Sequence, residues 1–434
     1  MPSNLSKYGL SCIMLMLAVG GVCAQPAAPL AAAQPASVPR GFAPTLRQIF
    51  DAAWLRQPEA QSLAARREAA MARRQAADSW TSEPVAMDLA AKGDRLNKNE
   101  GNREFAAGLV IPLWLPGEKA RSGALADAET RAGESRVLAA QLRIAAGVRL
   151  SYWQWQAARI EHALARERQA SARQLAADVA RRVQAGFLAR ADQHQADGAA
   201  AGADAAVAEA ASALASALQQ LRALFGGSAV DIGALSDDVA LLAEAVPALP
   251  ADFAALDATH PAVVALLDRA EVARRATELA RAQSRANPEL LVATTRDRGF
   301  SSEPYRQTMT LGIRLPFGSD SRNRARVAAA LAESLEAEGQ LGLERDRLTA
   351  ELDAARVRLE SARAQLAAAD ERARLARESR GFFDKSFRLG ESDLPTRLRI
   401  ELEAAEAGRQ AVRARINLAS TVSALRQALG LLPE

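Results

Sequence analysis

The sequence repeats its landmark residues at an almost fixed spacing, which constrains the fold more than any other feature. Gly186 and Gly390 lie 204 positions apart, as do Pro112 and Pro316. Leu224-Phe225-Gly226 and Ala428-Leu429-Gly430 keep the same spacing, and Gln57-Pro58 and His260-Pro261 keep one of 203. Landmarks that hold one register over most of a chain indicate two structural copies of one unit.

Each copy is predicted to contain a helix, two strands, a very long helix and a further helix. In the first copy we expect a helix over 45–79, strands over 83–91 and 103–112, and a long helix from Gly117 to about Gln184. No proline interrupts that last stretch, and ~68 residues at 1.5 Å each would reach ~100 Å. Charged residues are 24% of the chain and aromatic residues only 4%, a mixture that favours long helices.

The second copy is predicted to repeat this order. We expect a helix over 252–284, strands over 287–297 and 305–316, and a long helix from 319 to about 388. Leu348, Leu352, Leu359 and Leu366 in that helix follow one another at spacings of four and seven, as a coiled-coil seam requires. A solitary coiled coil would not explain the strands.

The sequence before the first copy is predicted to begin with an export signal, which sets the first of the predicted domain boundaries. Lys7 precedes an apolar run, and Val22-Cys23-Ala24 has the small residues of an export cleavage site. Cleavage after Ala24 would remove Cys12 and Cys23 and leave no cysteine, whereas lipidation of Cys23 is the alternative. The predicted division is a signal peptide over 1–24, an Ala/Pro-rich linker over 25–44, a first repeat over 45–227, a linker over 228–251 and a second repeat over 252–434.

The predicted strands alternate between apolar and polar residues, with the same parity in both copies. One face is expected to meet lipid and comprises Phe105, Leu109, Ile111, Met309, Leu311, Ile313 and Leu315. The opposite face of the last strand carries Arg306, Thr308, Thr310 and Arg314. Four strands are too few to enclose a channel, so three chains contributing ~12 strands are expected. A small soluble sheet with one buried face is the alternative.

Three short segments carry a resemblance to a known family: the opening Thr45–Glu59, Asn287-Pro288-Glu289-Leu290 and Leu315-Pro316-Phe317. In order and spacing the chain resembles the TolC-type outer membrane efflux family, and its style is similar to exporters of the heavy-metal and resistance-nodulation-division (RND) branch. The resemblance implies a mainly α protomer with a small antiparallel β part, and a homotrimer with a twelve-stranded β-barrel and a helical periplasmic tunnel. It also implies an outer-membrane location extending into the periplasm.

The resemblance further implies a passive exit duct for small molecules or metal ions in a tripartite efflux pump. The implied partners are a periplasmic adaptor protein, an inner-membrane transporter of the RND type and outer-membrane lipid. The implied contacts with the adaptor are the two tips, Gly186, Phe187, Leu188, Gly390, Glu391 and Ser392. Asp192, six residues past the first glycine, is the candidate for an acidic ring at the aperture, whereas the second copy has Thr396 there.

The sequence carries no motif for covalent chemistry: no nucleophile elbow, phosphate-binding loop, dinucleotide fingerprint or paired-histidine metal motif. We therefore predict no enzyme activity, cofactor or metal site, and His194 is interpreted as a solvated helix histidine. A formal net charge of +4 gives little support to a nucleic-acid partner. A type I secretion duct for polypeptides and a soluble periplasmic coiled-coil binding protein stay open as alternatives. The sequence does not predict the substrate, the cognate pump or the residues that close the aperture.

Overall fold

A computed structural model of the chain describes residues 45–96, 99–226, 243–248, 257–318 and 320–434. The predicted signal peptide and the linker over 25–44 lie outside the described residues, and so does most of the linker over 228–251. Among the helices of the described residues, none is both long enough and apolar enough to cross a bilayer.

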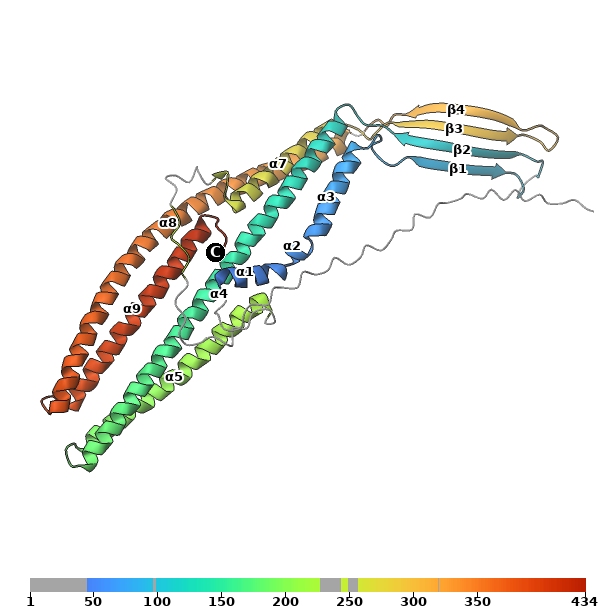
Figure 1. Cartoon of the computed structure of the whole chain (residues 1–434). Helices are drawn as coiled ribbons and strands as arrows, with labels where there is room; N and C mark the ends of the chain where they lie inside the picture. Colours follow the sequence, from blue (N-terminus) through green and yellow to red (C-terminus); the bar gives the residue numbers. More distant parts are fainter. Residues whose placement is uncertain (1–44, 97–98, 227–242, 249–256, 319) are drawn as a thin grey trace, which may run out of the picture. The chain divides into compact units, whose positions relative to one another are not determined.

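The first copy contains the predicted order of helix, strand, strand, long helix and helix (Figure 1). Its elements are α1 (Leu46–Leu55), α2 (Pro58–Gln61), α3 (Leu63–Asp78), β1 (Ala86–Gly93), β2 (Arg103–Pro112), α4 (Glu118–Gln184) and α5 (Arg190–Phe225). The prediction of one helix over 45–79 is wrong, because Gln57 adopts extended backbone angles and Pro58 starts a new helix. The first of these helices begins at a capping box, in which Thr45 and Gln48 accept each other's backbone N–H.

The second copy has the same order, which confirms the two tandem repeats. Its elements are α7 (Pro261–Ala282), β3 (Glu289–Arg298), β4 (Arg306–Arg314), α8 (Asp320–Leu389) and α9 (Leu394–Ala428). The expected helix start at residue 252 lies outside the described residues, and the described helix begins at Pro261 with His260 as its N-cap.

The four strands form one antiparallel sheet in the order β1-β2-β3-β4 (Figure 1). Each copy supplies one hairpin, and the two hairpins pair through β2 and β3, with Leu109 opposite Val292. The sheet therefore joins the two copies, and β1 and β4 are its edges.

The long helices pack in pairs, α4 with α5 and α8 with α9 (Figure 1). On α8 the predicted seam residues Leu348, Leu352 and Leu359 are buried, and the last two pack with Val422 and Leu425 of α9. The first pair has an aromatic core instead, in which Tyr152 and Trp155 of α4 lie among residues of α1, α5 and α9. Burial of these apolar side chains is the main source of stability for helices of this length.

Two buried polar clusters connect the copies. Near the sheet, Glu118 of α4 accepts hydrogen bonds from Gln283, at 2.7 Å, and Asn287, at 3.0 Å. Between α4 and α9, Glu244 accepts from Arg149 at 2.9 Å and lies 3.2 Å from Nε of Arg426. All three of the latter side chains are at most 5% exposed. Removal of either partner would be costly, because it would leave an unpaired charge buried between the helices.

Candidate functional site

One face of the sheet is apolar and uncovered in the described chain. The predicted residues Phe105, Leu109, Met309, Leu311 and Ile313 are exposed, and Ile111 lies on the same face at half burial. Met87 and Leu89 of β1, which the sequence reasoning did not single out, extend this face to the edge strand. Leu315 lies just beyond the end of β4 and is also exposed. The contact of this face with lipid stays a prediction.

The opposite face of the sheet is polar and carries cross-strand ion pairs. Lys92 lies 3.2 Å from Glu104, and Arg314 lies 2.8 Å from Glu289. The two faces therefore differ as they would if one met an apolar medium and the other met water.

The two helical hairpins end in turns with the same backbone geometry. Gly186 and Gly390 both have φ near +80°, the left-handed region that glycine adopts without steric cost. At each turn the residue after the glycine donates its N–H to the carbonyl five residues back, Phe187 to Arg182 and Glu391 to Ser386, both at 2.9 Å. This is the Schellman pattern, which closes a helix and allows an immediate reversal.

The predicted tip residues differ in exposure. Phe187 and Glu391 are exposed, whereas Leu188 and Ser392 are half-buried. Leu188 packs against a small apolar cluster at the tip that includes Phe387 and Leu394. The role of these turns as contacts for an adaptor stays a prediction.

Asp192 lies in the first turn of α5 and is half-buried. Its carboxylate accepts the backbone N–H of Ala189 at 3.0 Å, so the structure gives it a helix-capping contact. In the second copy the capping carboxylate is at a different position: Asp393 accepts the backbone N–H of Thr396 at 3.3 Å. Asp393 was missed in the sequence, although an aspartate two residues before a proline at a helix start is a recognisable N-cap signal. Whether Asp192 lines an aperture stays a prediction.

A cluster around Phe387 connects the two hairpins near their tips. Its ring, which is 2% exposed, lies between the guanidinium groups of Arg182 and Arg397, whose central carbons are 4.8 and 4.7 Å from the ring centroid. Asp178 pairs with Arg182 at 3.5 Å, and Asp384 pairs with Arg397 at 2.7 Å. The cluster combines cation–π contacts, ion pairs and apolar burial, and it links α4 of the first copy to α8 and α9 of the second.

The histidines His194 and His260 lie apart and take no part in a common site. Within the described part of the chain, no three His, Cys, Asp or Glu side chains are placed to hold a metal ion. His194 is exposed on α5, and His260 caps α7, where its Nδ1 accepts the N–H of Ala262 at 3.3 Å. Burial lowers the pKa of His260 below its ordinary value, with a smaller contribution from Arg347, although Glu344 acts in the opposite direction.

Several solved structures of bacterial outer membrane proteins have a similar fold. The CmeC outer membrane channel of Campylobacter jejuni is 16% identical, with a TM-score of 0.70 over 89% of this chain and 85% of that one. The outer membrane protein VceC of Vibrio cholerae is 18% identical, with a TM-score of 0.69 over 90% and 97%. The MtrE outer membrane channel of Neisseria gonorrhoeae is 17% identical, with a TM-score of 0.70 over 89% of both chains.

The chain thus shares the fold of these outer membrane proteins over most of its length. Residues 50–227 also match the sequence profile of the outer membrane efflux protein family. The profile match covers the first copy, and the shared fold covers both copies, so the chain is similar to the outer membrane efflux proteins in both respects. No curated protein sequence matches the chain significantly.

Proposed function

We propose that the protein is a passive exit duct of a tripartite efflux pump, located in the outer membrane and extending into the periplasm. The observation that most supports this proposal is that one chain joins a sheet with an uncovered apolar face to two pairs of very long helices. The 67 residues of α4 correspond to ~100 Å at 1.5 Å per residue, several times the thickness of a bilayer. Such a chain can place its sheet in a membrane and its helices far into the space beside it.

The proposed assembly is a homotrimer. β1 and β4 leave their outer edges unpaired within the chain, and pairing β4 of one protomer with β1 of the next would satisfy the backbone groups of both edges. Three copies of four strands would form a closed barrel of ~12 strands, with the apolar face outward and the face with Lys92, Glu104 and Arg314 inward. In this assembly the helices would form the periplasmic tunnel.

The proposed partners are those that the resemblance to the outer membrane efflux family implies. The tips at Gly186 and Gly390 would contact the hairpins of a periplasmic adaptor, and an inner-membrane transporter of the RND type would supply the energy. The protein itself would carry out no covalent chemistry. Small molecules or metal ions are the proposed cargo, and a type I secretion duct for polypeptides would use the same passage with a different pump.

Location and assembly provide the first test. In fractionated cells we expect the protein in outer-membrane extracts, as a trimer that resists detergent and dissociates on heating. A monomer recovered from periplasmic fluid without detergent would instead support a soluble coiled-coil binding protein.

Ion conduction in planar bilayers provides the second test. If three copies of Asp192 form an acidic ring at the aperture, Asp192→Ala should lower the preference for cations. Asp204→Ala is a matched control, because Asp204 is on the same helix but pairs with Arg173 at 2.9 Å. An unchanged current and ion preference in Asp192→Ala would remove this residue from the aperture without affecting the assignment as a duct.

A further inference from the structure

Three arginines cluster at the loop end of the apolar sheet face. Arg103 and Phe105 alternate along β2 and therefore share a face. Across the ladder, Arg298 is directly opposite Arg103, and Arg296 is directly opposite Phe105. The apolar face thus ends in a row of guanidinium groups at the side of the sheet farthest from the helices.

The row lacks carboxylate partners. Within the described residues, no ion pair involves Arg103, Arg296 or Arg298. The nearby acidic residues of the strands, Glu104 and Asp297, are on the opposite face, where Glu104 pairs with Lys92. Like charges directly across a strand pair are destabilising, so Arg103 and Arg298 favour an anion between or beside them.

One aromatic ring, that of Tyr305, contacts two of these arginines. The guanidinium carbons of Arg296 and Arg298 lie 4.7 and 4.8 Å from the ring centroid of Tyr305. Nε of Arg298 donates to the carbonyl oxygen of Gly101 at 3.2 Å. These contacts orient the arginines but leave most of their N–H donors available to a ligand.

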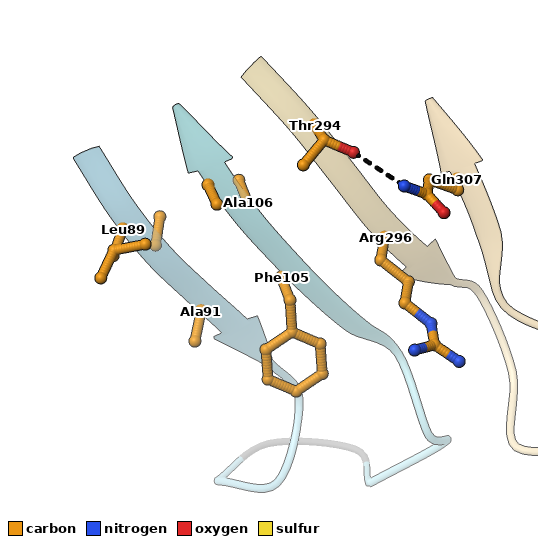
Figure 2. A pocket seen from close by; sticks show the side chains of 9 residues that line it. Leu89, Ala91, Phe105, Ala106, Thr294, Arg296 and Gln307 are labelled. Carbon is orange, nitrogen blue, oxygen red and sulfur yellow. Dashed lines mark hydrogen bonds between the residues drawn. The ribbon is translucent and has the colours of Figure 1, made fainter. Parts of the chain in front are cut away.

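A shallow hollow of about 530 Å³ adjoins the row (Figure 2). Its floor is apolar, with Leu89, Ala91 and Phe105 on one side, while Arg296 lies at its loop end and Gln307 donates to Thr294 at 3.2 Å. An acyl chain lying along this apolar floor would carry its headgroup to the guanidinium groups.

We propose that Arg103, Arg296 and Arg298 bind the phosphate of an anionic lipid in the outer leaflet of the membrane. The inference rests on the proposed function, which puts the loops on the outer side because the helices extend into the periplasm. A guanidinium matches phosphate bidentately and is well suited to such a contact. An annulus of bound lipid around the outer rim is the expected consequence.

The test measures lipid retention by the full-length trimer in detergent, using native mass spectrometry. The probes are lipid A with two phosphates, phosphatidylcholine and inorganic phosphate. The test variant is R103Q/R296Q/R298Q, and the matched control is K92Q/R306Q/R314Q, which removes three cations from the opposite face. We expect the control to retain lipid A like the unchanged protein, and the test variant to bind it at least about tenfold more weakly.

Two outcomes would overturn the proposal. Equal retention of lipid A by the test and control variants would exclude the arginine row, and displacement of lipid A by inorganic phosphate at equal concentration would show an anion site without a lipid. Arg296→Gln alone, at an exposed position, tests the same point if the triple variant does not fold. A protein that conducts ions but shows no preference for lipid A would contradict only this inference, whereas failure of the unchanged protein to enter membranes would contradict the proposed function.

Discussion

The two tips share one backbone design but use their phenylalanines in opposite ways. Both turns have a glycine near φ +80° and the same hydrogen-bond pattern. At the second tip Phe387 is 2% exposed, whereas at the first tip Phe187 is 80% exposed. At the position 204 residues before Phe387 the first copy has Val183, and at the position 204 residues after Phe187 the second copy has Glu391. The repeat therefore preserves the turn, but the second tip buries its phenylalanine in the protein and the first tip exposes its phenylalanine.

The largest expected effect in this comparison is the loss of Phe387. Phe387→Ala should lower the free energy of unfolding by about 3–5 kcal/mol, because it removes a buried ring together with the stacking of Arg182 and Arg397. Urea unfolding followed by circular dichroism in detergent measures the loss. Val183→Ala, at the matched position, should cost no more than about 1–2 kcal/mol. Equal losses would show that the tips are not specialised in this way.

Replacement of the glycines tests the part of the comparison in which the tips agree. Gly186→Ala and Gly390→Ala should each cost about 1–2 kcal/mol, because a side chain disfavours positive φ. At both glycines an added Cβ would meet no atom within 4 Å, so only backbone strain contributes and the two losses should be equal. Gly→Asn at either position should cost less, since asparagine tolerates the left-handed region. Clearly unequal losses would indicate a contact at one tip that the single chain does not contain.

Much of the fold could be predicted from the sequence because its signals are periodic and repeated. The copies, the strand pairs and the ends of α4 at Gln184 and α8 at Leu389 follow from spacing, proline placement and the tip glycines. The break at Pro58 was missed, since the helical periodicity of 45–79 continues on both sides of it. The pairing of β2 with β3 joins segments far apart in the chain, which no local pattern encodes.

The site was less accessible to sequence reasoning because its contacts are between elements. The repeat located both turns, but the stacking of Phe387 between Arg182 and Arg397 depends on how α4, α8 and α9 pack. The row of Arg103 and Arg298 depends on the strand register. The repeat also misleads where the copies differ. The residue equivalent to Asp192 in the second copy is Thr396, whereas the capping carboxylate of the second tip belongs to Asp393.

The capping carboxylate of the second tip should make part of its stability depend on pH. A hydrogen bond from the side chain of Thr396, opposed by desolvation and reinforced by the backbone N–H of Thr396, holds the pKa of Asp393 below its ordinary value of 3.8. A carboxyl whose pKa is lower in the folded state stabilises the protein at pH values above its ordinary pKa. This stabilisation is lost as the pH falls through the pKa of the folded state. Asp393→Ala should therefore lower the melting temperature at pH 6, and the difference should shrink as the pH falls to 3.

Asp393→Asn is the matched control for this prediction. Asparagine caps helices about as well as aspartate, so the variant should keep most of the stability at pH 6 without the titration. Melting curves of the three proteins between pH 3 and pH 7 provide the measurement. A constant difference between the unchanged protein and Asp393→Ala across this range would show that the carboxylate charge does not contribute.

The smallest expected effect on stability is that of Phe187→Ala, which should stay within about 0.5 kcal/mol because the ring is exposed. Its effect on binding should be much larger if the first tip meets the adaptor, since an aromatic anchor that becomes buried in an interface can contribute more than 1 kcal/mol. Surface plasmon resonance with the periplasmic adaptor should then show roughly tenfold weaker binding. Glu391→Ala, at the matched position of the second tip, should weaken binding less, because a solvated carboxylate buries little apolar surface. If both variants bind the adaptor like the unchanged protein, the exposed ring serves another contact, and the division of roles between the tips holds only for Phe387.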